Sequence, residues 1–369
     1  MIIKQLTPKD LQQFIYSEEY NRLTVVPITK HRALSHVNNP RVSPSDIILL
    51  IAYEDGELVG YLGVFADKIY LGDKEHKAGW LSTLWIDPRV RGKGIAKKLL
   101  SSALKAWDNK ILVTEFTPEA KGLYDRSGSF MDLKIAKGIR GNLRFNLHQL
   151  LPPKASFFKK IVGIIKCIDG FFNIFNAIRL FFWKPFVSLK GMKLEYVNEI
   201  DNEVKEFIEK KQAKGFTRRK VEDLNWIIQY PWLLFSPFRD RYSSRYHFSS
   251  VEKLFLMLNI KVYNNSDKLI GFVMFAIRGH NLKIPYCYFD EKDTGKIMRL
   301  IYKHMFRMHL NMLTTFNPFL SNHIKSHRTP FIHKRRMKRH YIISKIFKND
   351  LMSDRQIALQ DGDADCVFT

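Results

Sequence analysis

The sequence has few cysteines and no long uncharged apolar run. Three cysteines occur in 369 residues, and no two of them have the spacing of a metal site or belong to a disulfide framework. The first ten residues, MIIKQLTPKD, contain no apolar stretch behind the lysine. We therefore expect no secretory signal peptide and a cytoplasmic location. A secreted disulfide scaffold and a cysteine-based metal module are excluded.

Acidic residues are scarce relative to basic ones. The chain has 60 Lys and Arg against 36 Asp and Glu, a net charge of +24, in an otherwise ordinary globular composition with 46% hydrophobic residues. The 22 basic and 16 acidic side chains of residues 1–150 leave +6, and the remaining 38 and 20 leave +18. Such a field favours anionic partners, such as nucleic acid, anionic lipid or a polyphosphate ligand.

The pattern of apolar residues predicts two similar parts. Helices, a hairpin, a strand, a helix and a strand follow one another in the same order in both halves, and Leu151-Pro152-Pro153 interrupts the chain between them. We expect an α+β fold in which a largely antiparallel twisted sheet is flanked by helices, with two such domains in tandem. The expected boundaries are 1–150 for the first domain, 151–190 for an amphipathic linker helix region, 191–350 for the second domain and 351–369 for a tail.

A basic, glycine-containing loop follows a predicted strand in the first half. The strand ends at Ile86, and the loop Arg89-Val90-Arg91-Gly92-Lys93-Gly94 leads into a helix that begins at Ile95. Glycines let the backbone approach a ligand, and the first amides of a helix have no intrahelical partner and lie at the positive end of its dipole. The segment therefore predicts a phosphate-binding turn. A glycine turn with a solvated basic face is the alternative.

The segment from Leu84 to Leu100, with Arg89-x-x-Gly92-x-Gly94 at its centre, resembles the acyl-coenzyme A binding motif of GCN5-related N-acetyltransferases. The resemblance covers about residues 1–148. It implies that the strand backbone holds the pantetheine arm of acetyl-CoA and that the loop amides hold its pyrophosphate. The implied cofactor-binding residues are Leu84, Trp85, Ile86, Arg89, Val90, Arg91, Gly92, Lys93, Gly94, Ile95 and Ala96.

The resemblance also implies a catalytic acid. Tyr124 lies in a segment similar to the later helix of the family, where a tyrosine often protonates the departing thiolate. Thr117 replaces the asparagine often found there, and Gly128-Ser129-Phe130 is one residue longer than the usual Gly-Phe. Tyr124 is therefore either the general acid or a packing tyrosine.

The strand at 78–86 contains no carboxylate to serve as a general base. Glu115, at the end of the next strand, is the closest candidate, and a surface charge is its alternative role. A water relay through Ser82 and Thr83, or an acceptor amine of low pKa, would need no dedicated base.

The second half offers a poorer cofactor loop. Its equivalent segment, 289–296, has one glycine and three acidic residues, so we expect acetyl-CoA to bind the first domain only. The aromatic segment Asn225–Trp232 is either a wall of the acceptor cleft or part of the core. No metal is predicted, because neither the histidines near Lys334–His340 nor the alternating carboxylates Asp361–Asp365 form a recognised ligand set. The acidic end is expected to be a solvated tail.

Residues 157–186 are rich in Phe and Ile but are interrupted by charges, so they are too polar to span a bilayer. An amphipathic helix on an anionic membrane and a linker helix buried between the domains both explain the pattern. We favour the linker.

These features predict an acyl-CoA-dependent N-acyltransferase that moves acetyl from acetyl-CoA to an amine of a small anionic acceptor, such as an amino sugar or an envelope or polysaccharide precursor. One alternative is a non-catalytic CoA-sensing protein that docks on nucleic acid or on an anionic membrane. Another is a Fem-like aminoacyl transferase that uses charged tRNA. A nucleic-acid partner is disfavoured, because no recognised motif accompanies the basic cluster. The acceptor, the acyl chain length and the oligomeric state stay open.

Overall fold

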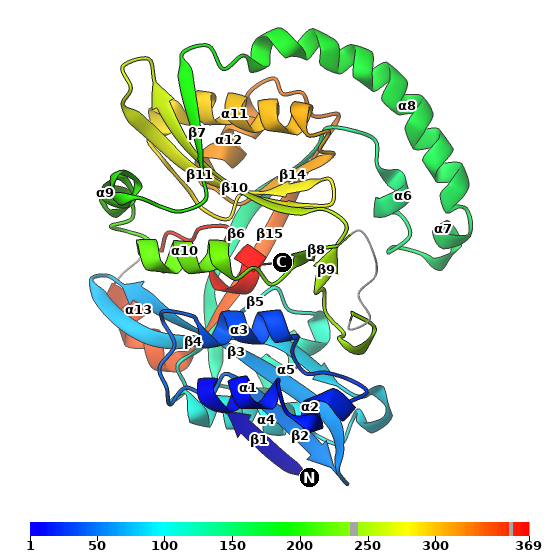
Figure 1. Cartoon of the computed structure of the whole chain (residues 1–369), viewed down its shortest axis with the longest axis vertical. Coiled ribbons are helices and arrows are strands. Elements are labelled where there is room, and N and C mark those ends of the chain that lie inside the picture. Colours follow the sequence, from blue (N-terminus) through cyan, green and yellow to red (C-terminus); the bar gives the residue numbers. More distant parts are fainter. Residues whose placement is uncertain (237–242, 354–356, 369) are drawn as a thin grey trace. The chain divides into compact units, whose positions relative to one another are not determined.

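The computed structural model describes residues 1–236, 243–353 and 357–368. The chain divides into two compact units (Figure 1). The first unit contains residues 1–136, 198–255 and 338–369, and the second contains residues 137–197 and 256–337. Both units are mixed α/β, as the sequence predicts.

The first unit is built on a sheet with the strand order β1-β2-β3-β4-β5-β15. Its pairs are antiparallel except β4 with β5. The predicted hairpin turn lies between β2 and β3, where Asp55 and Gly56 have φ of 52° and 80°. The strands and helices are β1 (Ile2–Leu6), α1 (Pro8–Phe14), α2 (Glu18–Arg22), α3 (Lys30–Val37), β2 (Leu49–Glu54), β3 (Glu57–Leu71), β4 (Lys74–Ile86), α4 (Ile95–Ala106), β5 (Ile111–Thr114), α5 (Pro118–Ser127), β6 (Phe130–Asn142), α9 (Asn202–Lys211), α10 (Val221–Gln229), β8 (Leu234–Phe235), β9 (Val251–Glu252), β15 (His333–Ser344) and α13 (Lys348–Ser353).

Strand β2 shows why this sheet is buried on both faces. Its residues Leu49 and Ile51 pack in a core with helices α1 to α3, whereas Leu50 and Ala52 pack in a second core with α4. Successive residues of a strand point to opposite faces, so a continuous apolar run fits a strand that is covered on both sides. The sheet thereby forms the middle layer of the unit and carries β4 toward the loop before α4.

The second unit repeats this plan with the strand order β6-β14-β12-β11-β10-β7, and β13 also pairs with β11. Here too one pair, β12 with β14, is parallel. The elements are α6 (Leu147–Leu150), α7 (Ser156–Lys160), α8 (Val162–Trp183), β7 (Met192–Val197), β10 (Phe255–Asn264), β11 (Leu269–Arg278), β12 (Asn281–Lys283), β13 (Cys287–Phe289), α11 (Thr294–Arg307), β14 (Met312–Thr315) and α12 (Pro318–Ser326). The predicted internal repeat is therefore present in the order of elements.

The two repeats exchange their last strands. β6, the last strand of the first repeat, pairs with β14, while β15, the last strand of the second repeat, pairs with β5. The units consequently differ from the expected division at residues 150, 190 and 350. Sequence patterns give the order of strands but not the partner of each strand, and for that reason the exchange could not be read from the chain.

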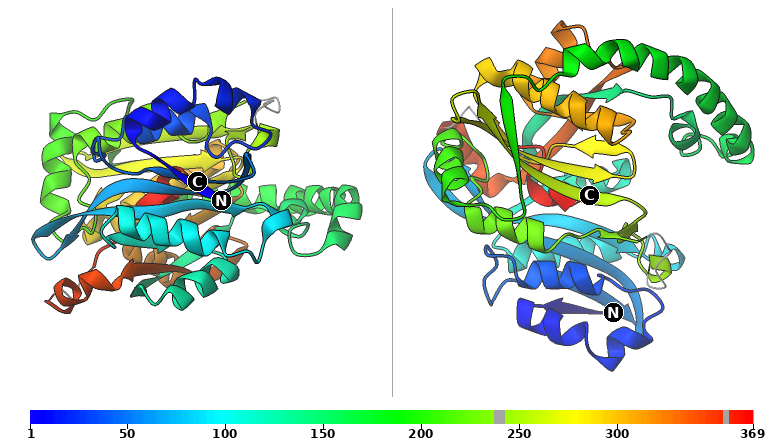
Figure 2. Two further views of the ribbon diagram at one scale, coloured as in Figure 1. Left: turned by 90° about the horizontal axis from the view of Figure 1, so that it is seen from below. Right: turned by 45° about the horizontal axis from the view of Figure 1, so that its top comes forward.

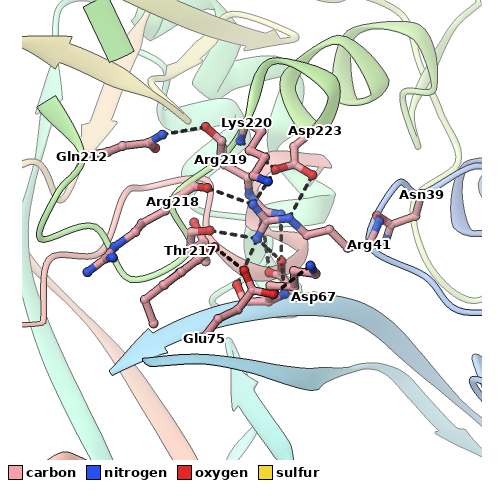
Figure 3. Close-up of polar contacts among 12 residues, drawn as sticks. Asn39, Arg41, Asp67, Glu75, Gln212, Thr217, Arg218, Arg219, Lys220 and Asp223 are labelled. Atoms are coloured by element: carbon pink, nitrogen blue, oxygen red, sulfur yellow. Dashed lines mark hydrogen bonds and ion pairs between the residues drawn. The ribbon is translucent and has the colours of Figure 1, made fainter. Parts of the chain in front are cut away.

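A buried ion network is one of the contacts that join residues 198–255 to the rest of the first unit (Figure 3). Asp67 on β3 accepts hydrogen bonds from Arg41 at 2.8 Å and from both terminal nitrogens of Arg219 at 2.8 Å. Arg41 also pairs with Asp223 on α10. All four side chains are at most 6% exposed. Two positive and two negative charges therefore balance inside the unit, which buried ions require.

Helix α8 exposes its apolar face and buries its polar face, the reverse of what we expected. Its large apolar side chains are exposed, whereas its buried positions include Asp169 and Asn176. Figures 1 and 2 show the helix as a long arc that leaves the strands of its own unit. The expectation that the aromatic stripe of this segment would be buried is wrong, because polar side chains attach the helix. Among the helices of the described residues, none is long and apolar enough to cross a membrane.

Candidate active site in the first unit

Strands β4 and β5 separate at their carboxyl ends. Over the described residues their parallel pairing covers Gly79 with Ile111 and Trp80 with Leu112, although β4 continues to Ile86. A register shift against β3 and a φ of 53° at Thr83 mark a bulge in this part of β4. The edge of β4 after Trp80 is thereby turned away from β5. An exposed strand edge offers backbone groups to an extended ligand.

The loop after β4 has the geometry of an anion site. A short 3-10 helix (Pro88–Val90) follows the strand, and Gly92 and Gly94 then adopt φ of 88° and 77°. A Cβ built on either glycine meets no atom within 4 Å, so open space lies beside the backbone. Gly94 is the N-cap of α4, whose first amides have no partner one turn earlier in the helix.

Basic side chains surround this loop, but they are not equivalent. Arg89 is paired with Asp87 at 2.7 Å and with Glu57 at 3.2 Å, and Lys93 is paired with Glu54 at 3.2 Å. Arg91 is exposed and forms no ion pair among the residues that the structure describes. Its charge is the least neutralised of the three.

The side chains of Leu84, Trp85 and Ile86, the strand residues expected to hold the pantetheine arm, all pack against other parts of the protein. Leu84 and Ile86 pack against the core under α4. The Trp85 ring stacks on Tyr61 at 5.4 Å and on His247 at 4.4 Å. Because their side chains are held in this way, the residues are fixed in register with β3 and present backbone rather than side chains to a ligand.

A carboxylate that sequence reasoning missed lies at the bulge of β4. Ser82 donates its hydroxyl hydrogen to Asp365, which belongs to a 3-10 helix near the chain end (Ala364–Phe368). Arg32 from α3 donates to the Ser82 hydroxyl at 2.7 Å and stacks on Trp232. Burial raises the pKa of Asp365, against the Ser82 hydrogen bond and the Arg32 charge, which lower it. A carboxyl with a raised pKa is a better proton acceptor.

The sequence led us to expect a solvated acidic tail at the chain end, but this segment is buried. Asp363 is fully buried and accepts a hydrogen bond from Thr217 at 2.6 Å, and burial raises its pKa to about 6. Phe368 stacks on Trp232 with ring centroids 4.5 Å apart. These contacts bring Asp365 to β4. Alternating Asp residues are typical of a polar surface, and no local signal in the sequence indicates that tertiary contacts bury them.

Trp226 and Trp232 are core residues rather than walls of an open cleft. They are 4% and 2% exposed, and their indole nitrogens donate to the backbone oxygen and the hydroxyl of Ser35. Of the two roles considered for this segment, packing is the one that the structure shows.

Tyr124 on α5 is a buried tyrosine on which the charge of Asp365 acts. It is 3% exposed, and its ring lies in edge contact with Phe116 and Phe130. Burial, together with the charge of Asp365, raises its pKa to about 12. A phenol with a raised pKa keeps its proton at neutral pH, so Tyr124 has a proton to donate, but it is a weaker acid than an ordinary tyrosine.

Glu115 is engaged by another side chain. It follows β5 with a φ of 51°, and it forms an ion pair with Arg339 at 2.9 Å. The structure therefore places Glu115 near enough to Asp365 for its charge to act on that carboxyl, and Arg339 occupies it as an ion-pair partner.

The equivalent turn of the second unit has a different character. A 3-10 helix (Glu291–Asp293) leads directly into α11. Asp293 is buried, and its Oδ1 forms an ion pair with Lys296 Nζ at 2.8 Å. A carboxylate at this helix start opposes anion binding. Within the described ranges, no group of three or more His, Cys, Asp or Glu residues could hold a metal ion.

The chain is similar to several known proteins. Residues 11–128 match the sequence model of the acetyltransferase (GNAT) family. A GCN5-related N-acetyltransferase from Anabaena variabilis has a TM-score of 0.50 at 11% identity over 93% of this chain and 72% of that one. A tandem GNAT protein from the clavulanic acid biosynthesis pathway has 0.48 at 10% identity, covering 93% and 97%. Saccharomyces cerevisiae N-myristoyltransferase has 0.49 at 11% identity, covering 93% and 78%. A search of curated protein sequences finds no match.

Proposed function

Because residues 11–128 match the sequence model of the acetyltransferase (GNAT) family, we propose that the protein transfers acetyl from acetyl-CoA to an amine of an anionic acceptor. One observation carries this proposal. Asp365 accepts a hydrogen bond from Ser82 at the bulge of β4, and its charge acts on Tyr124, so a proton acceptor and a proton donor of the first unit influence one another.

The cofactor fits the residues that are present. The open space beside Gly92 and Gly94 admits a pyrophosphate close to the amides that begin α4, and the edge of β4 that is not paired with β5 after Trp80 suits an extended pantetheine arm. Acetyl-CoA supplies the activated thioester. The loop and the strand edge bind and orient it, and backbone amides near the bulge polarise its carbonyl oxygen.

The side chains then handle the protons. Asp365 takes a proton from the acceptor ammonium, either directly or through the Ser82 hydroxyl or a water. The free amine attacks the thioester carbonyl, so that a C–N bond forms and the C–S bond breaks. Tyr124 gives its proton to the departing sulfur of coenzyme A and regains a proton from the amine nitrogen, directly or through water. Such paired acid and base groups are not needed by a protein that merely senses coenzyme A, which separates this proposal from a non-catalytic role.

The acceptor is proposed from charge. The net charge of +24, with basic residues around the cofactor loop, favours a phosphorylated or otherwise anionic amine over a neutral one. An amino sugar phosphate is a suitable first substrate. Its rate of acetylation should exceed that of the unphosphorylated amino sugar at low ionic strength, and the difference should shrink as salt is added. Equal rates for the two would contradict the charge argument.

The activity is tested by following the release of free thiol from acetyl-CoA in the presence of amines. Asp365→Asn should lower kcat/KM about 100-fold or more while acetyl-CoA still binds. Asp363→Asn is the matched control, since it neutralises a buried carboxyl of the same chain end that contacts Thr217 instead of β4. If both variants lose activity equally, the chain end has only a structural role.

The pH dependence sharpens this test. Asp365 can accept a proton only when ionised, and its raised pKa places that transition above the usual range of aspartate. The rate should therefore fall as pH falls through this transition, and the fall should be missing from the residual activity of Asp365→Asn.

A further inference from the structure

Helix α8 is attached to its unit by polar side chains. Asp169 accepts hydrogen bonds from the backbone amides of Leu147 and His148, both at 2.9 Å. Asn173 donates to the backbone oxygen of Phe145 at 2.9 Å and accepts from its amide at 3.0 Å. Asn176 donates to the backbone oxygen of Leu143 at 3.0 Å. These residues recur every three or four positions, so they share one face of the helix.

The opposite face is apolar and exposed. Ile174, Phe175 and Ile178 are 64%, 57% and 57% exposed, and they project away from the polar attachment. The neighbouring elements extend this face at both ends. Its large exposed apolar residues are Phe157, Ile164, Ile168, Phe171, Phe172, Ile174, Phe175, Ile178, Phe181, Phe182 and Phe186. A water-exposed helix ordinarily buries its apolar side, so this reversed arrangement indicates that another apolar phase covers the face.

Charge decides what covers it. Between residues 154 and 190 the chain has seven basic residues and one acidic residue, Asp169, which is turned into the unit and bonded there. Lys159, Lys160 and Lys166 lie toward one end of the face, and Lys184 and Lys190 lie toward the other. Aromatic and aliphatic side chains flanked by lysines are the pattern of a helix that lies in the interface of an anionic bilayer.

We propose that α7 and α8 dock the protein on an anionic membrane surface. The 22 residues of α8 make a rod about 33 Å long. It lies parallel to the bilayer, with its Phe and Ile side chains among the acyl chains and its lysines at the headgroups. The polar attachment of α8 then keeps unit 2 at the surface.

Co-sedimentation of the full chain with vesicles tests this docking. We expect binding to phosphatidylcholine vesicles that contain 30% phosphatidylglycerol, and at least tenfold weaker binding to pure phosphatidylcholine. The triple variant Ile174→Ser, Phe175→Ser and Ile178→Ser should lose binding to both. A matched triple, Ile2→Ser, Ile135→Ser and Ile346→Ser, removes exposed isoleucines elsewhere and should bind like the unchanged protein.

The charge contribution is tested separately. Replacing Lys159, Lys160 and Lys166 by Gln should weaken binding to the anionic vesicles about fivefold for each charge removed. Cys167, the one exposed cysteine in the described part of the chain, lies on the apolar side of α8 and can carry a polarity-sensitive dye. Its emission should shift to the blue with anionic vesicles.

Three results would overturn the proposal. The unchanged protein would fail to sediment with anionic vesicles, or the first triple variant would bind as well as the unchanged protein. Alternatively, sedimentation velocity would show self-association that the first triple variant abolishes, with no vesicle binding. In that last case the face would be an interface between copies of the chain. Acetyl transfer to a water-soluble amine should be equal in all of these variants, so failure of the docking is distinguishable from failure of the proposed activity.

Discussion

The turns that precede α4 and α11 occupy the same place in the two repeats, yet only the first is built for an anion. In both repeats a strand is followed by a short 3-10 helix and then by a long helix. The first has two glycines at positive φ and exposed basic side chains, whereas the second has a helical glycine, Gly295, and the buried carboxylate of Asp293. The fold thus supplies a helix start in both units, and the residues at that start decide whether a phosphate can use it.

The same comparison extends to the proton-transfer groups. Tyr124 is the seventh residue of α5, and the seventh residue of α12 is Ile324, which is fully buried. The residue directly after β5 is Glu115, and the residue directly after β14 is Phe316. Polar groups of the first repeat are replaced by apolar ones at both positions. The second repeat keeps the packing of the fold but has neither a tyrosine nor a carboxylate at these two positions.

The largest effect should come from removing the buried ion network of the first unit. Asp67→Asn leaves Arg41 and Arg219 buried beside a neutral group, and this should lower the free energy of unfolding by about 3–5 kcal/mol in denaturant titrations. Glu18→Gln breaks an ion pair whose side chains are 83% and 80% exposed, and it should change stability by less than about 0.5 kcal/mol. Similar small losses in the two variants would mean that the network does not hold residues 198–255 in the first unit.

The difference between the two turns can be broken by one carboxylate. Gly92→Glu sets a negative charge against the pyrophosphate, so calorimetric titration should show acetyl-CoA binding weakened at least about 100-fold, or about 2.7 kcal/mol. Gly295→Glu makes the matching change before α11 and should leave binding unchanged.

Backbone strain needs its own control. Gly72 has a φ of 62° and, like Gly92, open space beside it, so Gly72→Glu brings the same strain and the same charge at a hairpin turn. Its acetyl-CoA affinity should equal that of the unchanged protein. Loss of affinity in the Gly295→Glu variant instead would place the cofactor in the second unit.

The catalytic role of Tyr124 is tested by removing only its hydroxyl group. Tyr124→Phe keeps the ring packed against Phe116 and Phe130 and should lower kcat about tenfold to a hundredfold with no change in the Kd of acetyl-CoA. Tyr302→Phe removes another buried hydroxyl, in the second unit, and should leave both quantities unchanged. A Tyr124→Phe enzyme with full activity would reduce Tyr124 to the packing role that the sequence also allowed.

Local patterns predicted what depends on local chemistry. The hairpin at Asp55-Gly56, the glycine loop and the start of α4 at Ile95 each follow from a few adjacent residues, and the structure contains all three. The burial of Asp365 could not be predicted, because it depends on Ser82, which is 283 positions away in the sequence. The reversed polarity of α8 was missed for a related reason. Periodicity identifies an amphipathic helix but does not say which face meets the protein.

The smallest effects on acetyl-CoA affinity should come from replacing single basic residues of the two turns, and these effects should differ from residue to residue. Arg91 forms no ion pair among the described residues, although its charge lowers the pKa of Glu119, whereas Asp87 already neutralises Arg89. Arg91→Gln should therefore weaken acetyl-CoA binding about threefold to fivefold at low salt, and Arg89→Gln should weaken it less. Lys292→Gln, in the second turn, should have no effect. Because exposed charges are screened, the difference between Arg91→Gln and the unchanged protein should nearly vanish at 1 M salt. An equal loss from Arg89 and Arg91 would show that the ion pair with Asp87 opens when the cofactor binds, so that both guanidinium groups reach the phosphates.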